Sequence, residues 1–373
     1  MSIVMRINRI NVYSTQLPVK GGAYKMASAD VHSLDSTLVE VVTEDGTTGW
    51  GETCPVGPVY QPHHALGARA ALAEIAPGLI GEPLHSVRYL AKRMDERLNG
   101  HNYAKAAFDI AFLDLIGQRL GVPVSTLLGG ALTDRVPSYY STIVGSPDET
   151  ARIAADKVRA GYPRLQIKIG GRNLEKDVAT VHKVWEAVGH KARIAVDGNR
   201  GLSVAFALQL DRLCQNIPFV FEQPCNSMEE ISMLKRRLVH PLYLDENTED
   251  LNAVLRAISL GIADGFGLKV TRLGGLTKMM AARDLCSIRS LPHTCDDAWG
   301  GDIIAAACVH LASTVEPRAL EGAWIAQEYI DGHYDNTNPV IIENGHIAVP
   351  QQAGLGVKPE AGVFGTPVVS YGC

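Results

Sequence analysis

One pattern occurs five times in the chain, as Leu165-Gln-Ile-Lys168, Ile194-Ala-Val-Asp197, Phe219-Val-Phe-Glu222, Leu242-Tyr-Leu-Asp245 and Phe266-Gly-Leu-Lys269. Each segment is a short apolar run that ends in a charged residue, and successive charged residues are 29, 25, 23 and 24 positions apart. This spacing accommodates one strand, one helix and their connections. Apolar strands that alternate with helices predict a parallel sheet, whose strands bring their charged ends to the same edge.

Similar runs on both sides extend the pattern to eight strands, which favours a closed barrel over an open sheet. We therefore expect an α/β fold, a TIM-type (β/α)8 barrel in its modified (β/α)7β form, over residues 133–338. The expected strands are 138–143, 165–169, 193–197, 219–222, 242–245, 265–269, 291–293 and 319–321, and amphipathic helices are expected over 174–188, 229–237 and 277–290.

The two ends of the chain have a different texture. Residues 1–132 predict an α+β domain, with alternating strands over 4–13, 36–43 and 48–52 followed by helices over 65–76, 86–97 and 103–119. Residues 339–373 contain short strands and Gly/Pro turns, and we expect this tail to return to the N-terminal domain.

Composition excludes several classes of function. The 373 residues are 46% hydrophobic and carry a net charge of -5, which indicates a globular chain and argues against nucleic acid or an anionic membrane as partner. No apolar run reaches the ~20 residues of a membrane span. The seven cysteines are scattered and form no C-x-x-C pair, so we expect reduced thiols and a cytoplasmic location. We also expect a small-molecule substrate and a homo-oligomer, because barrels with an added domain often assemble.

The charged strand ends carry the predicted chemistry. In such barrels the active site lies at the C-terminal ends of the strands. Three carboxylates from adjacent strands, Asp197, Glu222 and Asp245, are the oxygen ligands that Mg²⁺ prefers, and without a cation they would repel one another. A lone charged strand end is usually a solvated cap, but five in register favour a site.

The two lysines lie on the strands that flank these carboxylates. A substrate carboxylate at the metal would place its α-carbon between Lys168 and Lys269, so that one lysine removes the α-proton and the other protonates the opposite face of the enediolate. We expect the metal, the second lysine and burial to lower the lysine pKa towards neutrality. Asn199 and Gln223 are interpreted either as groups that orient carboxylates or as ordinary turn residues.

These residues resemble the enolase superfamily, in the branch of muconate-lactonising enzymes and mandelate racemase. The segment 103–114 resembles the signature helix of that family's N-terminal capping domain. The resemblance implies that Lys168 is a general base, that Lys269 is the opposing lysine and that Asp197, Glu222 and Asp245 bind magnesium. One departure is Gln166, which stands where the family's K-x-K motif has its first lysine.

Three segments at the expected barrel mouth, 54–60, 296–302 and 321–327, suggest the substrate because they contain aromatic and acidic residues. Aromatic faces bind quaternary ammonium groups. The segments resemble those of the 4-hydroxyproline betaine 2-epimerases, which implies 1,1-proton transfer at C2 of 4-hydroxyproline betaine and proline betaine. The same resemblance implies substrate contacts for Tyr60, Gln166, Asp296 and Trp324, with Trp324 as the cation–π partner.

Other functions stay open. A cis-3-hydroxy-L-proline dehydratase would use one lysine to remove the α-proton and then expel the ring hydroxyl. An N-succinylamino-acid racemase or dipeptide epimerase would require a cationic or amide-binding pocket. A metal-dependent hydrolase is disfavoured because the chain lacks an early H-x-H pair, and a catalytically silent protein would not require two opposed lysines. His293 is interpreted as structural.

Overall fold

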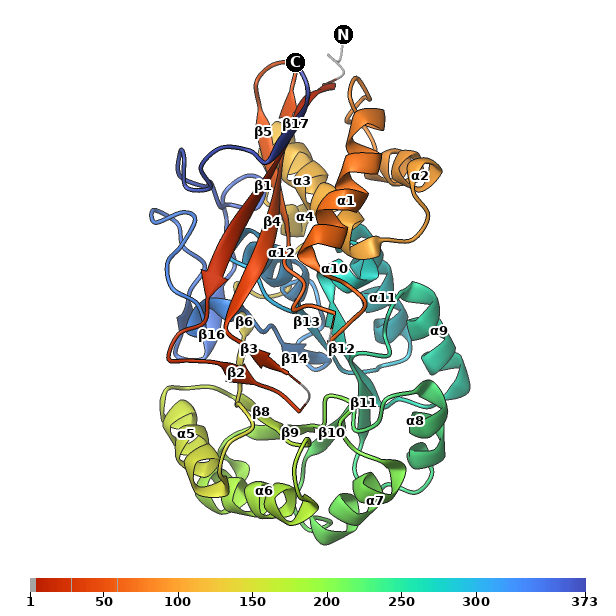
Figure 1. Cartoon of the computed structure of the whole chain (residues 1–373), viewed down its shortest axis with the longest axis vertical. Helices are drawn as coiled ribbons and strands as arrows, with labels where there is room; N and C mark the ends of the chain where they lie inside the picture. Colours follow the sequence, from red (N-terminus) through yellow and green to blue (C-terminus); the bar gives the residue numbers. More distant parts are fainter. Residues whose placement is uncertain (1–4, 28, 59) are drawn as a thin grey trace.

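The computed structural model describes residues 5–27, 29–58 and 60–373 and contains the expected parallel barrel (Figure 1). Eight strands follow one another in sequence order, and every neighbouring pair is parallel. An isolated parallel bridge pairs Ser138, just before the first strand, with Ala323, just after the last, and so connects the two edges of the sheet. The strands are β7 (Tyr139–Ser141), β8 (Arg164–Lys168), β9 (Arg193–Asp197), β10 (Val220–Glu222), β11 (Leu242–Leu244), β12 (Gly265–Lys269), β13 (His293–Asp296) and β14 (Leu320–Gly322).

Helices cover the outside of the barrel, and several begin at side chains that cap free backbone N–H groups. Ser146, Ser203 and Asp250 each accept a hydrogen bond from the first turn of a helix, and Ser227 forms a reciprocal capping box with Glu230. Within the described residues 323–373, a short 3₁₀ turn follows β14 and no α-helix does, which confirms the (β/α)7β form. The helices are α5 (Pro147–Arg159), α6 (Leu174–Val188), α7 (Val204–Leu213), α8 (Met228–Lys235), α9 (Leu251–Leu260), α10 (Val270–Leu273), α11 (Leu276–Ile288) and α12 (Asp302–Ala312).

The N-terminal segment forms a separate antiparallel sheet packed against helices. Strand β4 (Ser33–Thr43) lies between β1 (Ile7–Pro18) and β5 (Thr48–Thr53), and the nearly fully buried helix α3 (Asn102–Leu120) packs on this sheet. The expected strand 4–13 continues to Pro18 because it pairs with β4 along its whole length; Val4 lies outside the described residues. The other helices are α1 (Ala65–Ile75), α2 (Val87–Arg97) and α4 (Val124–Leu127).

The C-terminal tail contacts both parts of the molecule. Its last strand, β17 (Val369–Gly372), pairs with β1 at the edge of the N-terminal sheet. Earlier in the tail, β15 (Ile342–Glu343) and β16 (His346–Ala348) form a small sheet with β6 (Arg135–Pro137), which leads into the barrel. The tail therefore holds the N-terminal domain and the barrel together.

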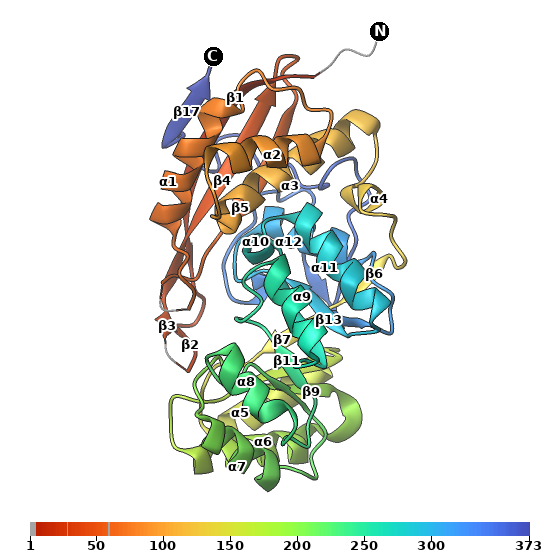
Figure 2. The ribbon, with the colours of Figure 1, turned by 90° about the vertical axis from the view of Figure 1, so that its right-hand side faces the viewer.

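Two segments of the N-terminal domain reach the mouth of the barrel. One is the hairpin of β2 (Tyr24–Lys25) and β3 (Asp30–Val31), which lies beside the carboxyl ends of the strands in both ribbon views (Figures 1 and 2). A Cβ at Gly171, just after β8, would lie 2.1 Å from the carbonyl oxygen of Ala27, so glycine permits this close approach. The other contains Tyr60 and Gln61, and Gln61 Nε2 donates to the backbone oxygen of Glu246, just after β11, at 3.3 Å. We call this N-terminal domain the capping domain.

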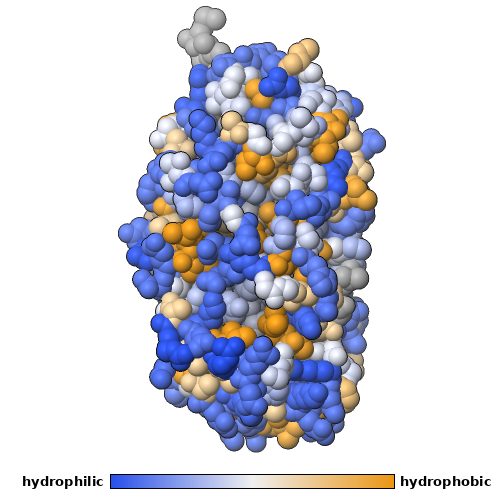
Figure 3. Space-filling model, turned by 60° about the vertical axis from the view of Figure 1, so that its left-hand side comes forward, coloured by the Kyte–Doolittle hydropathy of each residue, from blue (hydrophilic) through white to orange (hydrophobic). Residues whose placement is uncertain are grey.

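The surface agrees with the composition. The face in Figure 3 is largely hydrophilic and carries only separate apolar spots. Among the residues that the structure describes, no helix combines the length and the hydropathy that crossing a membrane requires.

Candidate active site

The charged strand ends meet at one end of the barrel. Lys168 on β8 is the register partner of Asp197 on β9, which is in turn the register partner of Glu222 on β10. Asp245 follows β11 directly and Lys269 ends β12. All five side chains are buried. Because β9, β10 and β11 lie between β8 and β12, the two lysines stand on opposite sides of the carboxylates.

Each lysine pairs with a carboxylate. Lys168 Nζ lies 2.5 Å from Asp197 Oδ2, and Lys269 Nζ lies 3.3 Å from Asp245 Oδ2. Burial alone would lower the pKa of Lys168 and of Lys269, but the negative charges of Asp197 and Asp245, respectively, outweigh it and raise both pKa values. These directions reflect burial and the lysine–carboxylate contacts alone. A lysine that acts as base must first lose its proton, so the lowering expected from a metal ion beside these carboxylates stays a prediction.

The carboxylates have unequal surroundings. Burial and the charge of Asp197 raise the pKa of Glu222 to about 7, although Arg164 opposes this shift from 3.5 Å. Burial also acts to raise the pKa of Asp245, but the guanidinium of Arg272 at 2.6 Å, together with Lys269, holds it well below its usual range.

The donor set suits a hard divalent cation. Three carboxylates on adjacent strands supply oxygen ligands, and Glu222 Oε2 is buried without a hydrogen-bond partner in the described part of the chain. A Cβ at Gly267 would lie 3.3 Å from both Glu222 Oε1 and Asp245 Cβ, so the glycine leaves space between these two residues. Within residues 5–27, 29–58 and 60–373, no three His, Cys, Asp or Glu side chains already converge as ion ligands. Each of the three carboxylates instead contacts a lysine or arginine of the chain.

Sequence reasoning missed two charged residues beside Asp245. Arg272 on α10 donates from Nη1 to the backbone oxygen of Asp245 at 2.5 Å and to its Oδ1 at 2.6 Å. Glu246 is 1% exposed, and burial together with the charge of Asp245 raises its pKa to about 8. The Asp245-Glu246 pair is visible in the sequence, whereas Arg272 lies on a short helix beyond a strand end.

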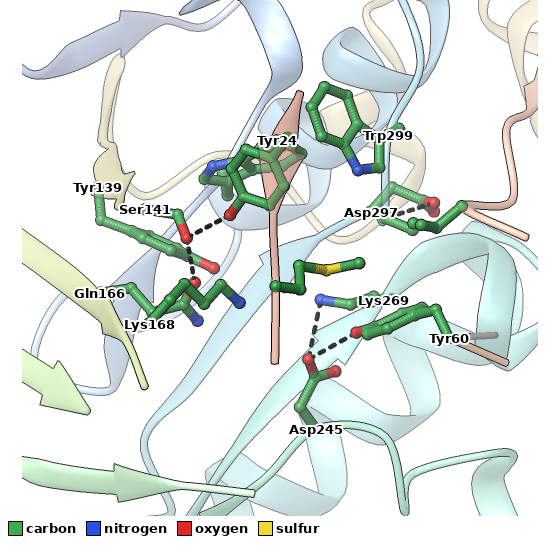
Figure 4. Close-up of a pocket in the computed structure, with 14 residues that line it drawn as sticks. Tyr24, Tyr60, Tyr139, Ser141, Gln166, Lys168, Asp245, Lys269, Asp297 and Trp299 are labelled. Carbon is green, nitrogen blue, oxygen red and sulfur yellow. Dashed lines mark hydrogen bonds and ion pairs between the residues drawn. The ribbon is translucent and has the colours of Figure 1, made fainter. Parts of the chain in front are cut away.

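A small pocket opens between the lysines (Figure 4). Its aromatic wall consists of Tyr24, Trp299 and Trp324, with Trp299 in edge-to-face contact with both other rings. Tyr60 and Gln166 also line it, so three of the four expected substrate-binding residues are at the pocket. Tyr24 was not expected there, because it comes from a hairpin more than a hundred residues from the barrel's charged strand ends. The lining residues are Tyr24, Met26, Val56, Tyr60, Tyr139, Ser141, Gln166, Lys168, Asp245, Lys269, Asp297, Ala298, Trp299 and Trp324.

Asp296 lies outside the pocket wall. Its carboxylate accepts hydrogen bonds from the Tyr139 hydroxyl at 2.8 Å and from the Trp324 backbone N–H at 2.7 Å. Strand β13 runs from His293 to Asp296 instead of ending at residue 293, so Asp296 is a barrel residue and Asp297 lines the pocket. We therefore do not propose Asp296 as a substrate ligand.

The two expected orienting residues act partly through the backbone. The backbone N–H of Asn199 donates to Asp197 Oδ1 at 2.8 Å, and its side chain donates to Glu246 at 3.1 Å. Gln223 Oε1 accepts a hydrogen bond from the backbone N–H of Asp245 at 3.0 Å. His293 is fully buried, with Nδ1 3.1 Å from the Leu291 carbonyl oxygen.

Comparisons with known proteins agree with this architecture. Residues 9–129 match the family model of the mandelate racemase/muconate lactonizing enzyme N-terminal domain, and residues 149–363 match the enolase C-terminal domain-like model. A cis-3-hydroxy-L-proline dehydratase of Roseibium aggregatum is 35% identical, covering 98% of this chain and 100% of that protein. An L-Ala-D/L-Glu epimerase of Clostridium acetobutylicum is 25% identical, covering 95% and 99%.

Solved structures of members of the same family have the same fold as this chain. A mandelate racemase/muconate lactonizing enzyme of Roseovarius nubinhibens superimposes with a TM-score of 0.94 at 32% identity and covers 99% of each chain. An enolase superfamily member from the same organism, complexed with magnesium, has a TM-score of 0.93 at 32% identity over 99% of this chain and 100% of that one. The chain belongs to the enolase superfamily, in its mandelate racemase and muconate lactonizing enzyme branch.

Proposed function

We propose that this enzyme is a magnesium-dependent lyase that removes the C2 proton of cis-3-hydroxy-L-proline and expels the ring hydroxyl as water. The observation that carries the proposal is the small pocket between two opposed lysines, in a chain 35% identical over 98% of its length to a cis-3-hydroxy-L-proline dehydratase. From the sequence alone, betaine epimerisation was the first expectation and dehydration the alternative. The similarity to a cis-3-hydroxy-L-proline dehydratase favours dehydration.

The stereochemistry of the substrate suits this pocket. In cis-3-hydroxy-L-proline the hydroxyl and the carboxylate share one face of the ring, so the C2 proton lies on the other face. Elimination therefore requires a base on one face and a proton donor on the opposite face. Lys168 and Lys269 approach from opposite sides of the pocket and supply both.

The reaction balances with these residues. One lysine takes the C2 proton, the C2–H electrons form a C2–C3 double bond, and the C3–O bond breaks as the departing oxygen receives a proton from the other side. Asp197, Glu222 and Asp245 would hold Mg²⁺, which supplies positive charge for the substrate carboxylate as C2 loses its proton. Tyr60, Gln166 and the aromatic wall confine the ring in the pocket and exclude water.

A second candidate is the epimerisation of 4-hydroxyproline betaine or proline betaine. The aromatic wall of Tyr24, Trp299 and Trp324, with Asp297 beside it, favours a quaternary ammonium group on the ring nitrogen. In this reaction one lysine removes the C2 proton and the other returns a proton to the opposite face, with no bond broken at C3.

Product analysis separates the two reactions. The enzyme is incubated with Mg²⁺ in D₂O and with cis-3-hydroxy-L-proline, 4-hydroxyproline betaine or L-proline betaine, and each sample is followed by proton NMR. We expect cis-3-hydroxy-L-proline to lose its C3 hydroxyl. Inert cis-3-hydroxy-L-proline, with deuterium and inversion at C2 of the betaines, would replace the lyase by the epimerase.

A further inference from the structure

Each of the two capping-domain segments at the pocket is connected by hydrogen bonds to one carboxylate of the proposed metal site. The first contact is direct. The Tyr60 hydroxyl donates to Asp245 Oδ2 at 2.9 Å (Figure 4). The same hydroxyl accepts a hydrogen bond from Arg272 Nη2 at 3.2 Å. Tyr60 is only 7% exposed, so water does not readily replace its hydroxyl.

The second contact is a chain of hydrogen bonds from Tyr24. The hydroxyls of Tyr24 and Ser141 are 2.8 Å apart, Ser141 Oγ donates to Gln166 Oε1 at 2.7 Å, and Gln166 Nε2 donates to Glu222 Oε1 at 2.9 Å. A serine hydroxyl has one proton, and the bond to Gln166 uses it. Tyr24 must therefore be the donor to Ser141, so every hydrogen bond of the chain points towards the Glu222 carboxylate.

We propose that the capping domain completes the metal site, with Tyr60 holding Asp245 directly and Tyr24 holding Glu222 through Ser141 and Gln166. Cation binding in the barrel and docking of these two capping segments then favour each other. This inference rests on the proposed magnesium site and concerns positioning residues, because neither tyrosine is a ligand in it.

Three physical arguments support the coupling. Hydrogen-bond donors to a ligating carboxylate fix its orientation, and removing such a donor commonly weakens metal binding by about 10–100-fold. Tyrosine and glutamine are neutral, so unlike Arg164 or Arg272 they orient a carboxylate without opposing a cation. Ser141 and Gln166 are 2% and 5% exposed, so water cannot easily substitute for a missing member of the chain.

The coupling also accounts for Gln166. A lysine at this position would bring a positive charge towards Glu222. The amide instead relays a hydrogen bond from Ser141 to Glu222, with its oxygen facing the serine and its nitrogen facing the carboxylate.

Isothermal titration of Mg²⁺ into the whole protein tests the proposal without any substrate. We expect Tyr60→Phe, Tyr24→Phe and Ser141→Ala each to raise the Kd for Mg²⁺ about tenfold. Because Tyr24 and Ser141 belong to one chain, the double variant should be no weaker than either single variant. The matched control is Tyr162→Phe, a buried tyrosine whose hydroxyl contacts Glu328 away from the site, and its Kd should stay within twofold of the unaltered protein.

Hydrogen exchange tests the reciprocal effect. Mg²⁺ should slow amide exchange in residues 19–27, 29–32, 54–58 and 60–61 of the unaltered protein. This protection should be lost around residue 60 in Tyr60→Phe and around the hairpin in Tyr24→Phe. Unchanged Mg²⁺ affinity in these variants would overturn the coupling and leave the metal site standing. An unaltered protein that binds no Mg²⁺ would overturn the metal site as well as the coupling.

Discussion

Acid should lower the free energy of unfolding through one buried histidine. His310 on α12 is fully buried; its Nε2 lies 3.0 Å from the Leu355 carbonyl oxygen, and its Nδ1 accepts the Ser125 N–H at 3.3 Å. One nitrogen donates and the other accepts, so the ring is held neutral. Burial lowers the pKa of His310 from 6.5 to about 4.

The direction and size of the effect follow from proton linkage. Well above pH 6.5 the ring is neutral in both the folded and the unfolded chain, and the stabilisation is complete. As the pH falls through 6.5 towards 4, only the unfolded chain takes up the proton. A depression of about 2.5 pKa units then removes roughly 3 kcal/mol of stability by pH 4.

The assay is urea unfolding at several pH values between 7 and 4, on the unaltered chain and on His310→Gln. Glutamine can donate to Leu355 and accept from Ser125, but it does not titrate. We expect the stability difference between the two proteins to shift by roughly 3 kcal/mol in favour of the variant as the pH falls to 4. Parallel curves for the two proteins would refute the assignment of a neutral, buried ring.

Three further perturbations probe the pocket and the metal site. Trp324→Ala should weaken a betaine ligand by about 1–2 kcal/mol and proline much less, as measured by calorimetry; equal losses would remove the cation–π contact. Removal of divalent cations with EDTA should abolish turnover and added Mg²⁺ should restore it, whereas full activity in EDTA would contradict the metal site. Arg272→Met leaves Asp245 buried without its strongest partner and should lower the free energy of unfolding by about 3–5 kcal/mol, read from urea denaturation; a stability equal to that of the unaltered chain would show that Arg272 does not anchor Asp245.

The barrel could be predicted from sequence because its signal is local and repeated. Each of Lys168, Asp197, Glu222 and Lys269 ends a short apolar strand, and Asp245 follows one directly. Parallel strands bring their ends to one edge, so their convergence follows from the order of the strands alone.

Two details of the site could not be predicted from the sequence, for physical reasons. Strand β13 starts at His293, two residues after its expected start at residue 291, and runs to Asp296, which places Asp296 in the barrel and Asp297 at the pocket. The lysine–carboxylate contacts of 2.5 and 3.3 Å were not predicted either, because no sequence pattern gives such distances.

The missed contacts join segments that are distant in sequence. Tyr24 and Ser141 are 117 positions apart, and Tyr60 and Arg272 are 212 positions apart. Such contacts depend on how the capping domain lies on the barrel. Neither helical nor strand periodicity carries that information.

In the proposed reaction, two opposed lysines exchange the C2 proton of a hydroxyproline-class carboxylate. The decisive experiment is proton NMR in D₂O with Mg²⁺ on the unaltered enzyme, Lys168→Ala and Lys269→Ala, with cis-3-hydroxy-L-proline and both stereoisomers of proline betaine as substrates. We predict that turnover falls by at least about a hundredfold in each variant, and that each variant still exchanges C2–H in at most one stereoisomer. Full turnover, or exchange of both stereoisomers, in either variant would contradict the two-lysine mechanism.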